Sequence, residues 1–511
     1  MNKSSSLFLL IKALSKQEKR YFKLFAKRHT ARKMNVYIRL FNAVEKQKSY
    51  DESALRTVFA GESFIRHLRV HKQYLYEIIL RSLDVFHANN SAESKLRKLI
   101  HYAEILYEKG LYKECGKVAA RAKKLAIQRD RPIQMLEVKK IEKMLMQRQL
   151  GFRSGDQSVT DLHDSTSAVL SQLTTENDFW SLSFRMFLFY NRKGAIRTSP
   201  EERWFNTVMK HPLFRKNINT LSYRSKFHFY YSHWLYYFMK DDYRNAYLNN
   251  KKLISLMEAR TGDIRENPAS YIVTLNNFIE DLRRLKKYKE CLHAISKLKA
   301  IRVTSKSMQE RVFINVFVQE TLLYTTTGEF EKGKALIQEA NENLEKFKST
   351  ISKTAELNIC YNAGVIYFGM GDYTKAKHWI NRILNDTSAI HMAYDIYCFA
   401  RLLNLVIHFE LGDQIFLEYI VKSAYQFFDK KKRLYKFEEL ILNFMRRRLP
   451  KIISREEFRE EFMELRSALL KITGQKFERK ALEYFDFISW LDSKIENRPF
   501  AQILKRKAGI N

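Results

Sequence analysis

Basic side chains at helical spacing are the clearest chemical feature near the start of the chain. The lysines recur every three or four residues and would share one side of a helix: Lys12, Lys16, Lys19, Lys23 and Lys27. Such a row can bind the phosphates of a polyanion through charge and hydrogen bonds. The same spacing is also typical of a solvated helix face. The sequence leaves both interpretations open.

The net charge of the whole protein is the second chemical signal. The chain has 91 Lys and Arg against 56 Asp and Glu, a formal net charge of +35, and residues 1–150 hold 33 basic against 14 acidic residues, an excess of 19. Such a surface attracts nucleic acid, an anionic membrane surface or an acidic protein, because neutralising a polyanion releases counterions. A codon bias toward Lys, Asn, Ile, Tyr and Phe is the alternative explanation.

Spacings that would support catalysis or metal binding are missing from the sequence. It contains no GxxxxGK[ST], GxGxxG, HExxH, CxxC or GxSxG motif. His67 and His71 are four residues apart, but neither the glutamate nor the third ligand of a zinc site accompanies them. The four cysteines are widely separated and are expected to be reduced packing residues: Cys115, Cys291, Cys360 and Cys398. We therefore expect a protein that is not an enzyme and has no cofactor.

Helices must position these side chains, and residues 357–384 show how the helices pair. Small and aromatic side chains would face each other across two helices: Ala363, Gly364, Tyr367, Tyr373, Ala376, Ile380 and Ile383. Gly371 and Asp372 separate the two helices, because glycine adopts the left-handed conformation that ends a helix without steric cost. The stretch predicts a helical hairpin.

The same pattern recurs along the chain. The aromatic residue that follows the turn stands at positions 243, 288, 330 and 373, Gln414 takes the equivalent place, and the separations are 45, 42, 43 and 41 residues. A sustained period indicates units that bury their apolar faces only against their neighbours. Tyr112 belongs to an earlier unit, and the 131 residues from it to Tyr243 leave room for two degenerate units. Their helices are expected at 135–149, 160–173, 179–192 and 200–210.

The spacing small-x-x-Tyr, followed by Gly-x-Tyr-x-x-Ala, resembles the tetratricopeptide (TPR) repeat. The period of about 42 residues exceeds the usual period of about 34 by roughly two helical turns. Cys360 stands where the family has a tryptophan. The resemblance covers residues 99–125 and 230–425. It implies an all-α, right-handed superhelical solenoid of antiparallel helix pairs with non-repeat helical ends.

Three regions are expected on this basis. They are a basic N-terminal helical region over 1–95, a TPR-like helical-repeat solenoid over 96–425, and C-terminal helices over 426–511 that cap the solenoid. Ser15 with Glu18 and Ser454 with Glu457 form capping boxes that predict helix starts. Segments 151–158 and 261–268 are expected to be loops. No apolar run is long enough to span a membrane or form the core of a signal peptide, so we expect a cytoplasmic protein.

A helix-turn-helix is an alternative interpretation of residues 51–86. Its second helix would present basic and amide side chains to a DNA groove: Arg66, Arg69, Lys72 and Gln73. The same helix carries a strong apolar stripe, which is more typical of packing within a bundle.

The TPR resemblance implies that the first helix of each pair lines a concave binding face. Direct register places Asn277, Gln319 and Asn362 at inward positions, where amides can donate to and accept from the backbone of an extended peptide. The lysine clamp that the chaperone-tail version of the fold uses for a terminal carboxylate has no match. Residues 227–238 are unusually aromatic, and Tyr231 and Phe238 are candidates for peptide contact. Packing between neighbouring helices is the alternative for these rings.

The function implied by the resemblance is a non-catalytic scaffold or adaptor that binds a protein or peptide partner on its concave face. The competing expectation is nucleic-acid or ribonucleoprotein binding through the basic N-terminal region. A third is a peptide-responsive regulator, because longer TPR-like units also occur in bacterial peptide receptors.

Overall fold

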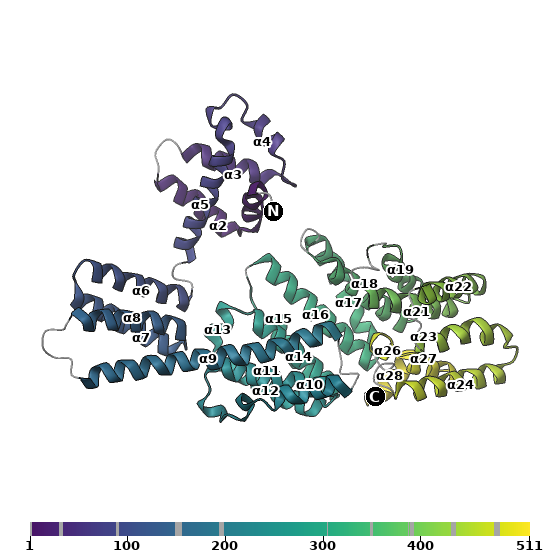
Figure 1. Cartoon of the computed structure of the whole chain (residues 1–511). Coiled ribbons are helices and arrows are strands. Elements are labelled where there is room, and N and C mark those ends of the chain that lie inside the picture. The colour runs from purple at the N-terminus through teal and green to yellow at the C-terminus, as the bar shows by residue number, and fades with distance from the viewer. Residues whose placement is uncertain are drawn as a thin grey trace.

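The computed structural model is helical throughout and describes residues 3–29, 34–87, 91–148, 156–193, 199–303, 305–347, 351–386, 388, 393–430, 436–474 and 481–510. These residues include no β-strand, and helices that follow one another in the sequence pack side by side (Figure 1). The all-α prediction is confirmed. Within the same ranges, no helix combines the length and apolarity needed to cross a lipid bilayer.

The N-terminal helices surround a core of their own, and we call them the N-terminal module (Figure 1). They are α1 (Lys3–Ala13), α2 (Lys16–His29), α3 (Met34–Lys46), α4 (Glu52–Val58), a 3-10 turn (Ser63–His67) and α5 (Leu68–His87). The Ser15 amide donates to Glu18 Oε2 at 2.7 Å and the Glu18 amide donates to Ser15 Oγ at 3.2 Å. This reciprocal pair is the predicted capping box, and α2 begins beside it.

Helix α5 uses its apolar stripe for packing inside the N-terminal module. It lies against α1, α2 and α3, with Leu75 and Ile79 fully buried. Lys72 is also buried, and its Nζ donates to Tyr50 Oη at 2.8 Å and to Glu52 Oε2 at 2.5 Å. The interpretation in which Lys72 faces a DNA groove is therefore wrong, because its charge is used within the module.

The next five helices correct one sequence expectation. They are α6 (Ala92–Glu108), α7 (Tyr112–Gln128), α8 (Pro132–Arg148), α9 (Asp156–Lys193) and α10 (Ser199–Met209). Helix α9 runs unbroken for 38 residues where two separate helices were expected. The interval 174–178 holds neither glycine nor proline, so nothing in it forces the backbone out of the helix. Of the predicted loop 151–158, residues 151–155 lie outside the described residues and the rest belong to α9.

Five hairpins follow in chain order, and we call them the array. Their helices are α11 (Tyr223–Met239) with α12 (Tyr243–Glu258), α14 (Ala269–Arg284) with α15 (Tyr288–Lys299), α16 (Lys306–Thr327) with α17 (Phe330–Phe347), α18 (Lys353–Gly369) with α19 (Tyr373–Leu384), and α21 (Tyr394–Glu410) with α22 (Gln414–Lys430). First helices pack on each other, α14 on α16, α16 on α18 and α18 on α21. The predicted loop 261–268 contains a short helix, α13 (Thr261–Glu266).

One turn geometry joins the two helices of each hairpin. Residues with a left-handed backbone, with φ between 56° and 80°, end the first helices of the α6–α7 pair and the array: Gly110, Asp241, Lys286, Gly328, Gly371 and Gly412. The amide of the residue after the left-handed position donates to the carbonyl five residues earlier, as from Asp372 N to Tyr367 O at 3.0 Å. This bond satisfies a carbonyl in the last turn of the first helix that has no partner within the helix. The helix begins again two residues after the left-handed position, where the sequence pattern placed the aromatic residue.

The C-terminal helices begin beside the last hairpin. They are α23 (Lys436–Asn443), a π-helical turn (Phe444–Arg448), a 3-10 turn (Leu449–Lys451), α24 (Arg455–Thr473), α26 (Ala481–Tyr484), α27 (Phe487–Ile495) and α28 (Phe500–Ala508). The predicted capping box of Ser454 and Glu457 is present at the start of α24. Helix α23 packs on α22, and α24 packs on α23 and α27.

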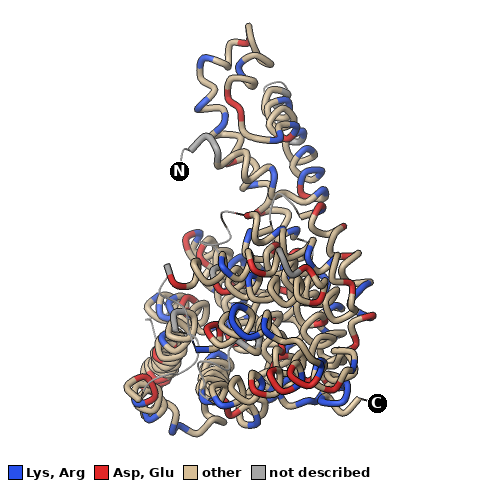
Figure 2. The backbone as a smooth tube through the Cα atoms, turned by 90° about the vertical axis from the view of Figure 1, so that its right-hand side faces the viewer, with Lys and Arg blue, Asp and Glu red and all other residues tan. Residues whose placement is uncertain are grey.

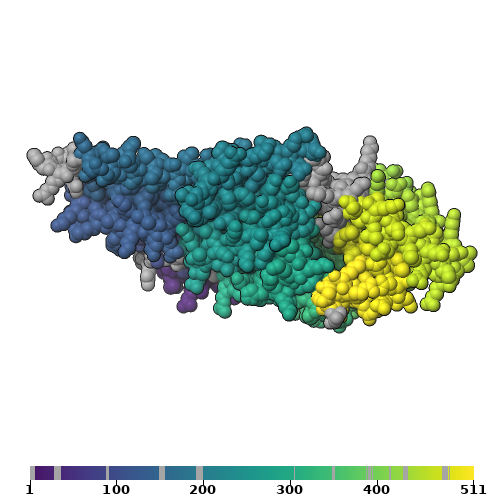
Figure 3. All heavy atoms as spheres, turned by 90° about the horizontal axis from the view of Figure 1, so that it is seen from below, coloured from purple at the N-terminus to yellow at the C-terminus, as the bar shows by residue number. Residues whose placement is uncertain are grey.

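From α27 onward the chain runs back along the turns of earlier hairpins, and we call these contacts the turn edge. Trp490 Nε1 donates to Glu410 at the end of α21 at 2.7 Å. The Phe500 ring lies 5.7 Å from that of Phe368, at the end of α18, and 5.8 Å from that of Phe330, at the start of α17. Helix α28 packs on α16, so the last helices lie against the middle of the chain (Figure 3).

Candidate functional site

The three predicted amide residues lie on first helices of the array, but two of them are buried. Asn277 on α14 is half-buried, whereas Gln319 on α16 is 4% exposed and Asn362 on α18 is 9% exposed. Gln319 Nε2 donates to Asn276 Oδ1 at 3.0 Å, and Asn362 Nδ2 donates to the carbonyl of Asn358 at 2.9 Å. Gln319 therefore links two neighbouring hairpins, and Asn362 bonds within its own helix. Asn276, one residue from the predicted position, completes the link.

The two predicted aromatic residues lie on α11 among other rings. Tyr231 is half-buried, with its ring centroid 5.5 Å from that of Trp234, and burial raises the pKa of its hydroxyl. Phe238 is half-buried with its ring 6.1 Å from that of Tyr190 on α9 and 5.9 Å from that of Tyr243 on α12. These rings pack α11 against its two neighbours, which is the alternative that the sequence left open.

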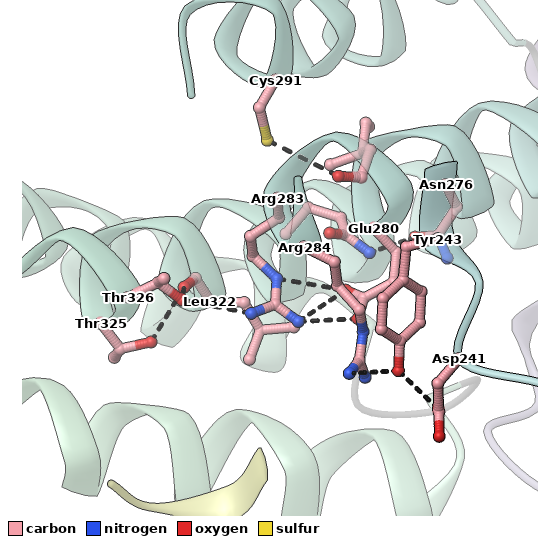
Figure 4. Close-up of polar contacts among 12 residues, drawn as sticks. Asp241, Tyr243, Asn276, Glu280, Arg283, Arg284, Cys291, Leu322, Thr325 and Thr326 are labelled. Atoms are coloured by element: carbon pink, nitrogen blue, oxygen red, sulfur yellow. Dashed lines mark hydrogen bonds and ion pairs between the residues drawn. The ribbon is translucent and has the colours of Figure 1, made fainter. Parts of the chain in front are cut away.

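An acidic and basic cluster, shown in Figure 4, lies at the end of α14. Arg283 Nη2 and Arg284 Nε each donate to Glu280 Oε1 at 2.7 Å. Burial by itself would raise the pKa of Glu280, and the two guanidinium groups outweigh this effect and lower it. The carboxylate is therefore ionised and held by two cations.

The same arginines connect three successive hairpins (Figure 4). Arg284 Nη1 donates to Tyr243 Oη at 3.1 Å, and the Tyr243 hydroxyl donates to Asp241 Oδ1 at 2.8 Å. On the other side, Arg283 Nη1 donates to Thr326 Oγ1 of α16 at 3.2 Å. Each of these groups is satisfied by another group in the chain, so the network fixes how neighbouring hairpins are placed. The sequence pattern gave no signal for it, because the bonded side chains meet only when neighbouring hairpins pack together.

A second polar group, Asp281, is fully buried between α11, α12 and α14. Its carboxylate accepts from Trp234 Nε1 at 3.1 Å and from Asn250 Nδ2 at 2.8 Å. Burial raises the pKa of Asp281 to about 8, because removing the carboxylate from water disfavours its charged form.

Four of the five lysines in the predicted row line a hollow of about 360 Å³ in the N-terminal module, and Lys12 does not. Its lining residues are Lys16, Lys19, Arg20, Lys23, Leu24, Lys27 and Glu45. Lys19 and Lys23 pair with the Glu45 carboxylate at 3.1 and 3.3 Å. Burial would raise the pKa of Glu45, and these two lysines lower it. Lys12 lies on α1 rather than on α2, because the Ser15 cap separates the helices, and its Nζ donates to the Glu45 carbonyl at 2.7 Å.

Three cations of the hollow remain available to a ligand. Lys16, Arg20 and Lys27 are exposed, and none of them has an ion pair within the described part of the chain. The first 50 residues hold 13 basic and 2 acidic residues, so the hollow lies in the most basic part of the N-terminal module. Figure 2 shows Lys and Arg recurring along these helices at the top of the view. The arrangement suits an anion with several phosphates.

His71 and the four cysteines are accounted for by packing, whereas His67 is exposed. The Tyr37 hydroxyl lies 2.9 Å from His71 Nδ1, and all four cysteines are buried. Over the described ranges, no group of three or more His, Cys, Asp or Glu side chains is arranged to hold a metal ion. In comparisons with known proteins, no family model, curated protein or solved structure matches the chain.

Proposed function

We propose that this chain is a non-catalytic scaffold or adaptor, a TPR-like solenoid with right-handed superhelical stacking, which binds a protein or peptide partner. The observation that carries the proposal is the array, in which hairpins with one turn geometry stack in chain order. Bonds between hairpins, such as Gln319 to Asn276 and Arg283 to Thr326, support a rigid surface. A preorganised surface loses less entropy when a partner binds.

Cross-linking of the full-length protein to a partner that co-purifies with it, after nuclease treatment, tests this proposal. Lysine cross-links are expected between the partner and helices α11 to α22. Cross-links confined to residues 3–87, or loss of the partner with nuclease, would contradict the scaffold function.

The N-terminal hollow favours a second function, binding of nucleic acid. Lys16, Arg20 and Lys27 have no acidic partner among the described residues, and they are close enough in sequence to contact successive phosphates. Binding through such contacts weakens steeply with salt, because each neutralised phosphate releases counterion.

Replacing these three residues together, Lys16→Glu, Arg20→Glu and Lys27→Glu, is predicted to weaken binding of single-stranded RNA. The slope of log K against log salt should fall by about 2, since each contact to a single strand contributes about 0.7. The matched control replaces Lys95, Lys113 and Lys124 with Glu, because these exposed lysines of α6 and α7 give the same change in net charge. Filter binding or fluorescence anisotropy across a salt series measures the RNA affinity of the triple variant and of the control. An equal loss in the control would show that only net charge matters.

A further inference from the structure

A second hollow, of about 350 Å³, opens between α12, α14 and α15 of the array. Ile254, Leu275, Phe278 and Ala294 give it an apolar lining. The other lining residues are polar and lie on α15: Lys289, Glu290, His293 and Lys297. The hollow is formed largely by second helices, whereas the sequence predicted a binding face on first helices.

The walls of this hollow are fixed by contacts around Tyr247 of α12. The Tyr247 ring stacks on that of Phe278 with centroids 5.5 Å apart and planes within 15°. The Tyr247 hydroxyl donates to Glu290 Oε2 at 3.3 Å, which ties α12 to α15. The apolar lining is therefore held in place before any ligand binds, and a ligand side chain can enter without reordering the helices.

The side chains around the hollow that have no ion pair among the residues that the structure describes are basic. Glu290 is paired with Lys287 at 3.0 Å and Glu258 with Lys297 at 2.7 Å, so both nearby acids are already neutralised. Lys289 and His293 are exposed, and Lys289 has no ion pair in the described ranges. The groups left to meet a ligand are therefore basic.

We propose that this hollow binds an acidic peptide segment that carries one large apolar side chain. The apolar side chain would contact Phe278 and Leu275, and flanking carboxylates would pair with Lys289 and, when protonated, His293. The volume is at the small end of the range for binding sites, about 300–1,000 Å³, which suits one anchoring side chain rather than a folded surface. The proposal rests on the scaffold function, because it states the chemistry of the partner that the array binds.

Labelled peptides and the full-length protein test this in fluorescence anisotropy. The first peptide has a central Phe between runs of Glu, the second replaces Phe with Ala, and the third replaces Glu with Gln. The first is expected to bind. Replacing Phe with Ala is expected to weaken binding about tenfold or more, since a buried ring contributes at least this much. Replacing Glu with Gln is expected to weaken binding about fivefold, since pairs between exposed charges contribute less. Equal binding of the Phe and Ala peptides would overturn the proposal, because it would indicate simple attraction between opposite charges.

The double substitution Lys289→Glu with His293→Glu locates the site. Both side chains are exposed, so the fold should persist, and affinity for the Phe peptide should fall about tenfold. Lys113→Glu with Lys124→Glu is the matched control and should bind as the unaltered protein does. Unchanged affinity in the Lys289 and His293 variant, or no binding of the Phe peptide, would overturn the proposal. If the native partner still cross-links to α11–α22 outside this hollow, the scaffold function stands although the peptide site is wrong. If the partner forms no cross-links to α11–α22, the scaffold function itself is wrong.

Discussion

Replacement of Gly328 by alanine is predicted to loosen the turn edge. Gly328 ends α16 with φ of +71°, and a Cβ added there would lie 2.5 Å from Ala501 O and 3.0 Å from Lys505 N of α28. Both of these atoms belong to backbone and cannot rotate away. Gly328→Ala therefore requires either a change of the turn or a shift of α28.

The loss of unfolding free energy in Gly328→Ala can be worked out by comparison with Gly371. Gly371 has φ of +80°, but a Cβ added to it would have nothing within 4 Å. Gly371→Ala should cost only the left-handed backbone strain, about 1–2 kcal/mol in the free energy of unfolding. Gly328→Ala should cost the same strain plus the displacement of a packed helix, about 1–3 kcal/mol more. The difference between the two variants measures the contact with α28.

Urea unfolding and amide hydrogen exchange of both variants provide the assay. We expect a lower unfolding midpoint for Gly328→Ala than for Gly371→Ala, together with faster exchange at residues 500–508 in the first variant only. Equal midpoints and unchanged exchange in α28 would refute the reasoning, since α28 would then not lie against the turn.

Two further predictions concern buried carboxyl groups of α14. Burial raises the pKa of Asp281 to about 8 from a model-peptide value of 3.8, so the folded state holds this proton more tightly. The stabilisation from this proton is complete below about pH 4 and is lost as pH rises through 8. The Asp281→Asn variant should therefore show a smaller fall in unfolding free energy between about pH 4 and 8, measured by urea unfolding at each pH. An equal fall in the variant and the unaltered protein would contradict this prediction. Glu280→Gln should lower the unfolding free energy by about 2–3 kcal/mol, because Arg283 and Arg284 lose their shared carboxylate in a mostly buried site. A loss below about 0.5 kcal/mol in urea unfolding would show that the arginines find other partners.

Local signals in the sequence predicted local structure well. The capping boxes at Ser15 and Ser454 begin helices as expected, and the recurring aromatic position marks the second helix of each hairpin. These signals act within one or two turns of helix, so they need no knowledge of distant residues. The left-handed residues Asp241 and Lys286 were not foreseen, because their turns lack the glycine that usually reveals this conformation.

The candidate site depended on longer-range geometry and was predicted less completely. One residue corresponds to about 100° around a helix, so the register that placed Asn277 inward missed Asn276, which bonds to Gln319. Glu45 was not singled out, because only the packing of α3 against α2 brings it to Lys19 and Lys23. The hollow between α12 and α15 had no sequence signal, since its lining combines three helices.

The turn edge also bears on the order in which the protein is made. Lys286 Nζ donates to the carbonyl of Lys507, which follows it by 221 residues. At a synthesis rate of about 5–20 residues per second, roughly 10–45 s separate the two. Within that interval the rings of Phe330 and Phe368 lack their cover from Phe500, which is made 170 and 132 residues after them, roughly 7–34 s later. The nascent chain thus carries an apolar strip that is covered only when the last helix, α28, has been made.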